Sequence, residues 1–340
     1  MSGRHFAAAM ALAVWTAAAD GGSVASLLEK VRSGLQARQS DGDLAAAVDA
    51  MQLTERLDDA AIEQLQTEGA GPQVVEALER RRDLSYRMTI PTGLPKLFEA
   101  PPAPSAAEWA AVLEKARTFA THYTANLPNF LCALEVRRYS NAKKTPGWKT
   151  ESRLTWEVGY ADRKERQTLL AIDGQPTTRK NVRGATSTGE FGGVMAVIFK
   201  PESLTKFGWE RWANLNGRPA YVFSFHIDRE HSEYGMHASG RLIGHNTAVA
   251  MRGLVYIDRE SEQVRRVVYE AEGVPDGFPI QAMHSVVDYD YSDIGGEKFL
   301  LPRRSSLRMV TKDGSRHRNV TEFAKYRKFT SEAKIDFEKQ

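Results

Sequence analysis

After Pro128 the hydrophobic residues recur at every second position, and this period constrains the fold more than any other feature of the chain. The segments RLTWEVGY, AYVFSFHI and VVDYDYS each place aromatic or branched apolar side chains on one face of an extended chain. Turn sequences separate such segments, at Asp173-Gly174, Asn216-Gly217, Gly295-Gly296 and Asp313-Gly314. The pattern predicts a meandering antiparallel sheet of roughly eight or more strands.

One predicted hairpin is apolar on both faces. In GLVYIDRESEQVRRVVYEA, residues 253–271, Val255 and Ile257 alternate with Leu254 and Tyr256. An antiparallel sheet with one wet face needs only one apolar face. We expect both faces to lose water where a sheet curls and its concave side is covered. The hairpin therefore predicts a curved sheet.

Two predicted helices are available to cover such a sheet. Residues 106–127, AAEWAAVLEKARTFATHYTANL, carry apolar side chains at helical spacing and end at Leu127-Pro128. Residues 187–203 offer Ser187 or Thr188 as a helix cap, then an apolar run that stops at Lys200-Pro201. The predicted fold class is α+β, a large curved antiparallel sheet forming an unclosed half-barrel wrapped around helices. A small all-helical module precedes it.

Composition divides the chain into segments. Residues 23–88 predict short helices, with Ser23 and Asp43 as caps and Pro72 opening the last helix after Gly69 and Gly71. Residues 89–106 hold a proline-rich stretch typical of a semi-rigid linker. Residues 107–338 form the predicted β-domain. Residues 20–130 have a net charge of −5 and residues 131–340 a net charge of +7, which supports a boundary between them.

The first residues resemble a targeting signal. Arg4 and His5 precede a short apolar run, and Ala17 and Ala19 offer a small-residue cleavage site. We expect residues 1–19 to be a signal peptide and the protein to be periplasmic or extracellular; an ordinary Ala-rich helix is the alternative. The run is too short to span a membrane, and no later segment predicts a span.

The sequence predicts no metal site or cofactor. Four histidines, His226, His231, His237 and His245, lie close together, but neither a helical His pair nor a Cys pair accompanies them. Solvated strand and loop histidines are the favoured interpretation. No phosphate-binding glycine motif occurs, and the net charge of +3 together with the helix pattern does not favour nucleic acid as a partner.

No catalytic residue is predicted either. The single cysteine, Cys132, cannot form an internal disulfide, and pairing it with His122 as a nucleophile and base finds no local signature. A buried free thiol is the simpler interpretation. A serine hydrolase elbow is absent from the sequence, and Asp288 and Asp290 alternate with aromatics, as on a solvated strand face.

A family resemblance comes from the hairpins. GLVYIDRESEQVRRVVY, followed by VVDYDYSDIGGEKFLLPRRSSLRM, resembles the repeating hairpins of LolA-like proteins. The shared features are the Gly-aromatic-Ile-Asp strand, the polar turn, the Val-x-Arg return strand and the Leu-Pro after a Gly-Gly turn. The segment LPNFLCALEVRRY is also similar to one in uncharacterised exported bacterial proteins. The resemblance covers roughly residues 107–338 and implies an unclosed barrel that carries or senses lipid or lipoprotein acyl chains in its concave cavity.

The aromatic strand faces are the candidate ligand site, either as the lining of a cavity or as a packed core against the helices. The candidate lining residues are Trp156, Tyr160, Tyr221, Phe223, Phe225, Tyr289 and Tyr291. The favoured function is an exported, non-catalytic protein that binds a lipid or a lipidated partner, with the helical module docking an envelope protein. A structural envelope protein with a packed core is the alternative. An enzyme is the second alternative, and it requires His226, His231 or Cys132 to converge.

Overall fold

The computed structural model describes residues 22–329 apart from residues 87, 92–100, 143–146, 180–181, 183–188, 216 and 240–243. The chain separates into two compact units, Met1–Leu97 and Phe98–Gln340. The predicted signal peptide and half of the predicted linker, residues 92–100, lie outside the described residues, as do the expected caps Ser187 and Thr188.

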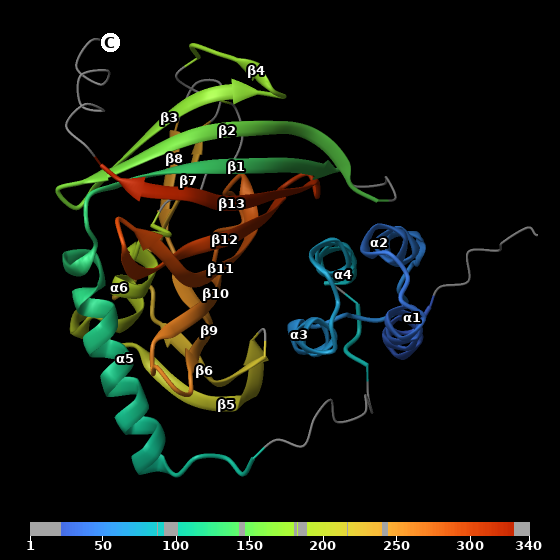
Figure 1. Ribbon diagram of the computed structural model, residues 1–340, viewed down its shortest axis with the longest axis horizontal. Coiled ribbons are helices and arrows are strands. Elements are labelled where there is room, and N and C mark those ends of the chain that lie inside the picture. Colours follow the sequence, from blue (N-terminus) through green and yellow to red (C-terminus); the bar gives the residue numbers. More distant parts are fainter. Residues whose placement is uncertain are drawn as a thin grey trace, which may run out of the picture. The chain divides into compact units, whose positions relative to one another are not determined.

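The described residues of the first unit form four helices, which we call the helical module (Figure 1). They are α1 (Val24–Gln36), α2 (Asp41–Ala50), α3 (Asp59–Thr67) and α4 (Pro72–Ser85). Each helix contributes its apolar stripe to one buried cluster, because none could bury that stripe alone. The most enclosed members include Val24, Leu27, Val31, Val48, Leu57, Leu65, Val74 and Leu78.

Side chains from neighbouring segments complete the helix ends of the module. Ser23 caps α1 as expected, and its Oγ accepts a hydrogen bond from the Ser26 amide at 3.1 Å. The expected Asp43 cap is wrong: Ser40 caps α2 and accepts from the Asp43 amide at 3.2 Å. The apolar residues of α2 begin at Leu44, so their spacing did not show that the helix already starts at Asp41.

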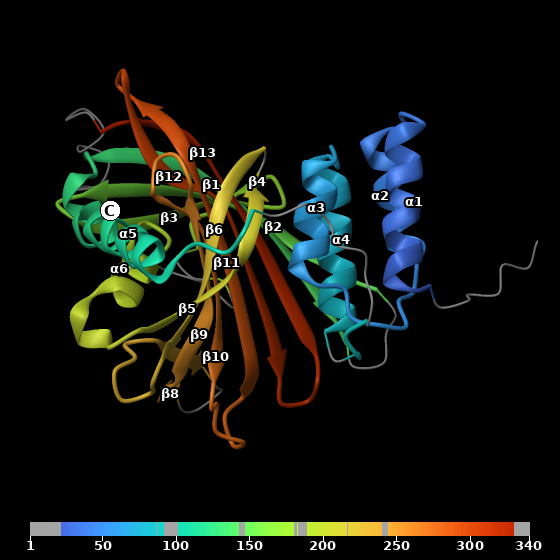
Figure 2. The ribbon, with the colours of Figure 1, turned by 90° about the horizontal axis from the view of Figure 1, so that it is seen from below.

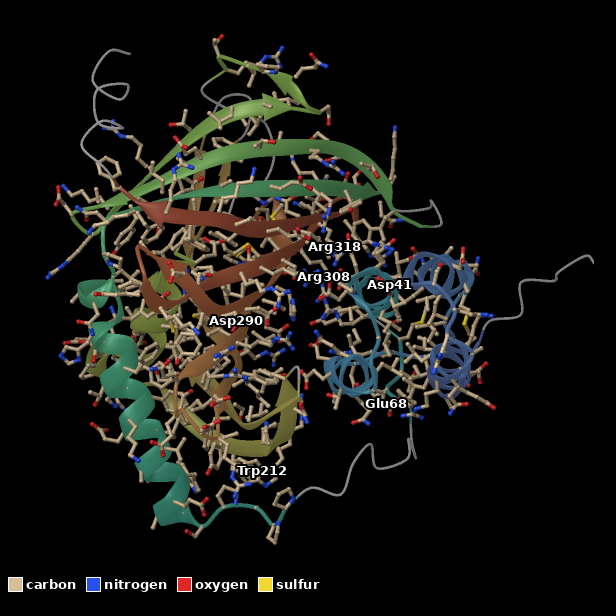
Figure 3. The ribbon with its side chains drawn as sticks, viewed as in Figure 1. Asp41, Glu68, Trp212, Asp290, Arg308 and Arg318 are labelled. Atoms are coloured by element: carbon tan, nitrogen blue, oxygen red, sulfur yellow. The ribbon has the colours of Figure 1, made fainter. Side chains whose placement is uncertain are left out.

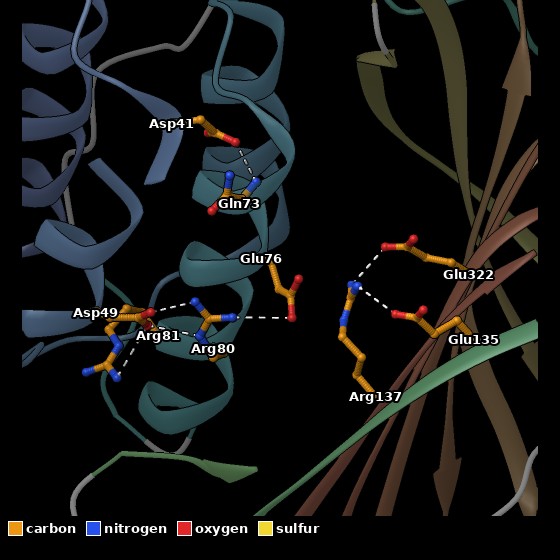
Figure 4. A network of polar contacts seen from close by, with 9 residues as sticks. All are labelled: Asp41, Asp49, Gln73, Glu76, Arg80, Arg81, Glu135, Arg137 and Glu322. Atoms are coloured by element: carbon orange, nitrogen blue, oxygen red, sulfur yellow. Dashed lines mark hydrogen bonds and ion pairs between the residues drawn. The ribbon is translucent and has the colours of Figure 1, made fainter. Parts of the chain in front are cut away.

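Asp41 also serves a second helix. Its carboxylate accepts hydrogen bonds from the amides of Gln73 and Val74 at 2.9 and 3.2 Å, at the start of α4 (Figure 4). The N-cap of α4 is Gly71, which has no side chain to offer. Further along, Arg80 of α4 pairs with Asp49 of α2 at 2.5 Å and with Glu76 of its own helix at 3.3 Å. These contacts link α2 to α4 at both ends.

Replacing Asp41 with Ala should lower the stability of the helical module by about 1–2 kcal/mol, since two amides of α4 lose their acceptor. Urea denaturation followed by circular dichroism at the helix band measures this change. Residues 20–97 contain no tryptophan, so in protein that lacks the predicted signal peptide tryptophan fluorescence follows the other unit and serves as the internal control. An unchanged helix transition would contradict the assigned role of Asp41.

The second unit is a long helix followed by a large sheet, which we call the β-domain. Helix α5 (Ala106–Asn126) starts at Ser105, whose Oγ accepts from the Glu108 amide at 3.2 Å. The sheet has 11 strands in the order β4-β3-β2-β1-β13-β12-β11-β10-β9-β6-β5, and all neighbours are antiparallel. In chain order the strands are β1 (Phe130–Asn141), β2 (Lys149–Ala161), β3 (Lys164–Ile172), β4 (Gln175–Pro176), β5 (Lys206–Leu215), β6 (Arg218–Ile227), β9 (Ala250–Asp258), β10 (Val264–Glu272), β11 (Ile280–Ile294), β12 (Glu297–Thr311) and β13 (Arg316–Lys328).

The sheet is curved and unclosed, because its end strands β4 and β5 pair with no further strand among the described residues (Figures 1 and 2). A separate hairpin, β7 (Gly235–Ser239) and β8 (Gly244–Ala248), stands outside it. The predicted fold class is confirmed. Among the described residues, none of the helices combines the length and apolar composition that a bilayer span requires.

Helices α5 and α6 (Gly193–Phe199) lie on the concave side of the sheet (Figures 1 and 2). Helix α6 begins after Gly192, which has a left-handed φ of 105°. The Tyr123 hydroxyl of α5 donates to the Leu300 carbonyl at 2.8 Å, and Arg117 donates to the Phe199 carbonyl at 3.0 Å. The buried cluster between these helices and the sheet is the helix-covered core; it includes Val112, Ala116, Tyr123, Met195, Ile198, Phe223, Val255, Ile257, Val267 and Val287.

The hairpin with two apolar faces divides between two clusters. Val255 and Ile257 of β9 belong to the helix-covered core. Tyr256 points to the outer face and packs in a smaller cluster with Ala213, Val222, Val268 and Val286, which we call the outer cluster. The expected curvature of the sheet explains why the concave face of β9, with Val255 and Ile257, is covered. The apolar residues on the other face of β9 are explained by the outer cluster, to which Tyr256 belongs.

Charged side chains surround the outer cluster. The Arg211 guanidinium donates to the Tyr256 hydroxyl at 3.1 Å, and Arg266 pairs with Asp288 at 2.5 Å. Arg265 pairs with Asp290 at 2.6 Å. Arg308 and Arg318, also labelled in Figure 3, are direct cross-strand neighbours on β12 and β13. The outer face is therefore mainly polar around a small apolar centre.

Gly253 allows β9 to approach β10 closely. A Cβ at this position would lie 1.9 Å from the Val268 carbonyl oxygen and 2.8 Å from the Tyr269 Cα, and both atoms belong to the backbone. Backbone atoms cannot rotate away as a side chain can, so only glycine fits without moving a strand.

Replacing Gly253 with Ala should therefore destabilise the β-domain by about 3 kcal/mol, at the upper end of overpacking costs. Guanidinium denaturation followed by tryptophan fluorescence measures the loss. The control is Gly193→Ala in α6, where a Cβ meets nothing within 4 Å and φ is not in the left-handed range. That change should stay within about 1 kcal/mol of the parent protein.

Candidate functional site

Four of the seven candidate aromatic residues lie in the helix-covered core. Tyr221, Phe223, Phe225 and Tyr289 are each at most 6% exposed. The Phe223 ring lies 6.2 Å from the Trp109 ring of α5. The Tyr289 hydroxyl donates to the Glu190 carbonyl at 3.0 Å, and burial raises the pKa of Tyr289 well above its ordinary value. These side chains are packed against the helices.

Tyr160 and Trp156 belong to a second cluster at the end of β1 and β2. The Tyr160 ring stacks on Phe130 at 5.1 Å, and its hydroxyl donates to the Thr124 carbonyl at 3.2 Å. Phe191 covers this group from inside the sheet, with its ring 5.3 Å from the Phe130 ring. Trp156 is half-buried at the border of the cluster.

Tyr291 lies apart from the other candidates. Its side chain is 38% exposed, and its hydroxyl donates to Gln263 Oε1 at 2.7 Å. The Arg265 guanidinium stands 5.2 Å from its ring centre. The two-residue alternation of the sequence assigned Tyr291 to the same strand face as Tyr289. Alternation does not show where along a strand the covering helices end, so it could not predict that Tyr291 is exposed.

Trp156 borders an apolar surface on the concave face of β1, β2 and β3. Alternation along β1 puts Leu134 and Val136 on the face of Phe130 and Cys132. The register places Leu134 opposite Trp156, and Trp156 opposite Leu169. The next row continues from Val136 through Leu154 to Ile172. We call these six residues the apolar strip: Leu134, Val136, Leu154, Trp156, Leu169 and Ile172.

The apolar strip is separate from the helix-covered core. Leu154 and Leu169 are buried, whereas Val136 and Ile172 are half-buried, and none of these four joins any of the five clusters formed by the described residues. The sequence offered a weak signal for it in LEVRRY and RLTWEVGY. Strand β3 gave none, since a register shift opposite Thr155 and Trp156 hides its alternation.

Polar side chains border the strip on two sides. Thr321 of β13 lies opposite Val136, and Ser305 of β12 lies opposite Thr321. The Ser305 hydroxyl is 3.4 Å from a carboxylate oxygen of Glu190, whose side chain is buried. At the far end of the strip, Arg138 lies opposite Ser152. The concave face thus combines an apolar surface with hydrogen-bonding groups at its border.

The groups proposed for catalysis do not converge. Cys132 is buried on the concave side, whereas His226 pairs with Glu272 at 3.2 Å on the strand face opposite Phe225. Strands β1 and β6 are separated by β13, β12, β11, β10 and β9 in the sheet. His122 is exposed on α5.

The histidines considered as a metal site are distributed over several elements: His231 follows β6, and His237 and His245 occupy β7 and β8. In the part of the chain that the structure describes, no group of three His, Cys, Asp or Glu side chains is arranged to hold a metal ion.

Cys132 is a neutral thiol in this setting. Burial, followed by the charges of Glu165 and Glu157, raises the pKa of its thiol to about 12. Because the thiolate is the reactive form, a thiol with this pKa is almost wholly unreactive at neutral pH.

A maleimide or an aromatic disulfide reagent should therefore label the native protein at least about a hundredfold more slowly than the protein unfolded in urea. Mass spectrometry over a time course gives both rates, and the unfolded sample supplies the control because Cys132 is the only cysteine. Fast labelling of the native form would mean that the thiol is accessible.

No protein-family model matches the chain, and no curated protein matches its sequence. Solved structures do match it. A LolA superfamily protein from Nitrosomonas europaea is 12% identical, over 66% of this chain and 96% of its own, with a TM-score of 0.29. A structure described as an outer membrane lipoprotein-sorting protein domain from Vibrio parahaemolyticus is 13% identical, over 67% and 97%, with a TM-score of 0.33. A DUF1329 family protein from Desulfovibrio piger is 9% identical, over 64% and 94%, with a TM-score of 0.29.

The resemblance to LolA-like proteins expected from the hairpins is thus found among solved structures. At TM-scores of this size the likeness carries no detail of a site, a ligand or an activity. The curved sheet and its concave face are established by the strand order and the clusters described above.

Proposed function

We propose that the β-domain is a non-catalytic binding module that holds the apolar chain of a lipid, or of a lipidated partner, on its concave face. The observation that carries this proposal is the apolar strip on β1, β2 and β3. It lies inside a curved sheet, and the other half of that sheet is already filled by α5 and α6. Apolar clefts with a few polar groups at their border are typical ligand sites.

The free energy available on such a surface is sufficient for binding. Each buried methylene contributes about 0.8 kcal/mol, so about ten methylenes correspond to the roughly 8 kcal/mol of a micromolar Kd. Loss of ligand freedom reduces this figure. A long single acyl chain therefore suits the strip better than a small apolar molecule.

A carrier of this kind needs a rigid frame and performs no reaction. The helix-covered core supports the frame through contacts between α5, α6 and the middle strands. The neutral Cys132 thiol and the position of His226 on the other face support a non-catalytic role. No cofactor or metal enters the proposal.

Export and a second partner belong to the same proposal. The N-terminal pattern of residues 1–19 supports a periplasmic or extracellular location, where lipids and lipoproteins are in transit. The helical module is a compact unit with its own core, which supports a separate role in docking an envelope protein.

A structural envelope protein with a packed core is the second candidate. The observation that favours it is the helix-covered core, where Phe223 is 0% and Phe225 2% exposed. Under this function the concave face takes no ligand, and the apolar strip is covered by the protein's own chain.

Displacement of the neutral fluorescent probe 1-aminoanthracene by palmitate or hexadecanol separates the two candidates. A binding module should show displacement at micromolar concentrations of the alkyl chain. Val136→Trp should weaken binding by about tenfold or more, because the larger ring fills the strip. Thr155→Trp, on the other face of β2, is the matched control. Absence of probe and chain binding, together with lipid-free native mass spectra, would favour the structural candidate.

A further inference from the structure

Arg138 stands at one end of the apolar strip and on the same face. Strand β1 is regular in its pairing with β2 from Phe130 to Arg138, so Leu134, Val136 and Arg138 alternate onto one side. Phe130, Cys132 and Leu134 share the inner cluster with Phe191, which identifies that side as concave. Four residues of extended chain separate Leu134 from Arg138, a span of about 13 Å.

Arg138 forms no ion pair with any of the residues that the structure describes. The side chain is half-buried, and its Nε atom is buried without a hydrogen-bond partner. Between residues 22 and 329, within the described ranges, no hydrogen bond or ion pair joins its guanidinium to another residue. Its cross-strand neighbours are Ser152 on β2 and Asn319 on β13, and neither can neutralise a positive charge.

The adjacent arginine shows the contrast. Arg137 points to the outer face, where its guanidinium lies 2.8 Å from Glu322 and 3.7 Å from Glu135 (Figure 4). On the concave face the carboxylate of Glu190 lies beside Ser305 of β12. The register places Thr321 of β13 opposite Ser305 and Val136 of β1 opposite Thr321, so β13 separates Ser305 from Val136. Arg137 therefore has acidic partners, whereas the concave-facing Arg138 has none among the described residues.

A partly desolvated guanidinium without an anion is costly, because burial removes water from a group that stays charged at all ordinary pH values. Its planar fork of donors suits a carboxylate or a phosphate, which it can bind through two parallel hydrogen bonds. Since Arg138 adjoins the apolar strip, one amphiphilic molecule can satisfy both features.

We infer that Arg138 binds the anionic end of the ligand, so that the β-domain selects single-chain amphiphiles ending in a carboxylate or a phosphate. The acyl chain lies along the half-buried side chains of Val136 and Trp156, and the head group meets the guanidinium beside Ser152. This inference rests on the proposed function and narrows its ligand class.

Competition binding on the full chain tests the inference, with 1-aminoanthracene as the displaced probe. Palmitate and hexadecyl phosphate should bind about tenfold or more tightly than hexadecanol, which has the same chain and no charge. Acetate and inorganic phosphate, which lack the chain, should not displace the probe. The wild-type comparison needs no variant, so a folding defect cannot obscure it.

Variants then assign the preference to one residue. Arg138→Met should reduce the ratio of anion to alcohol affinity to about one, and Arg138→Lys should retain part of the ratio. The matched control is Arg153→Met, an exposed arginine on the other face of β2, near Glu135. It should change neither affinity.

The outcomes separate this inference from the proposed function. Equal binding of palmitate and hexadecanol by the wild-type protein, or a full preference retained in Arg138→Met, would overturn the role of Arg138 and leave the lipid-binding function intact. Displacement by inorganic phosphate alone would identify a free-anion site instead and also overturn it. If no alkyl compound bound, both proposals would fall.

Discussion

The covering of the concave sheet face is the constraint on which the rest of the β-domain depends. An 11-stranded sheet with an aromatic inner face cannot leave that face in water, since burial of apolar surface is the main source of folding free energy. Helices α5 and α6 supply the cover, and they are fixed to the sheet and to each other by the Tyr123 and Arg117 hydrogen bonds. Four residues of the strip on β1, β2 and β3 lie outside the clusters that these helices help to form, and two of them, Val136 and Ile172, are only half-buried.

The fold could be predicted from the sequence because its apolar residues follow two clear periodicities, one typical of strands and one typical of helices. Alternation at two residues predicted the strands, and the spacing in residues 106–127 predicted α5. The beginnings of helices were harder, because a cap depends on one hydrogen bond: Ser40, four residues before the first apolar residue of α2, holds that position in place of Asp43. Helix α6 likewise begins after Gly192, whose conformation no apolar pattern encodes.

The candidate site was less accessible to sequence reasoning. Large aromatic residues marked the inner face correctly, but size alone does not separate a side chain packed under a helix, such as Phe223, from one at a free border, such as Trp156. Arg137 and Arg138 are adjacent and chemically identical, so only the register shows that one has Glu322 as a partner and the other faces the strip. Strand β3 carries Leu169 and Leu170 in succession, and the shift in pairing beside them conceals which of the two points inward.

The unclosed edge has a mechanical consequence. In a closed barrel every strand has two partners, so widening the ring must break a ladder of backbone hydrogen bonds. Strand β5 and the two-residue β4 are not paired to each other, and among the described residues the hydrogen-bonded series ends at both. The aperture between these ends can therefore expand or contract through small changes in strand twist, and the resisting force comes from side-chain contacts with α5 and α6. A curved sheet with two unpaired ends can therefore widen or narrow while its strands keep their backbone hydrogen bonds.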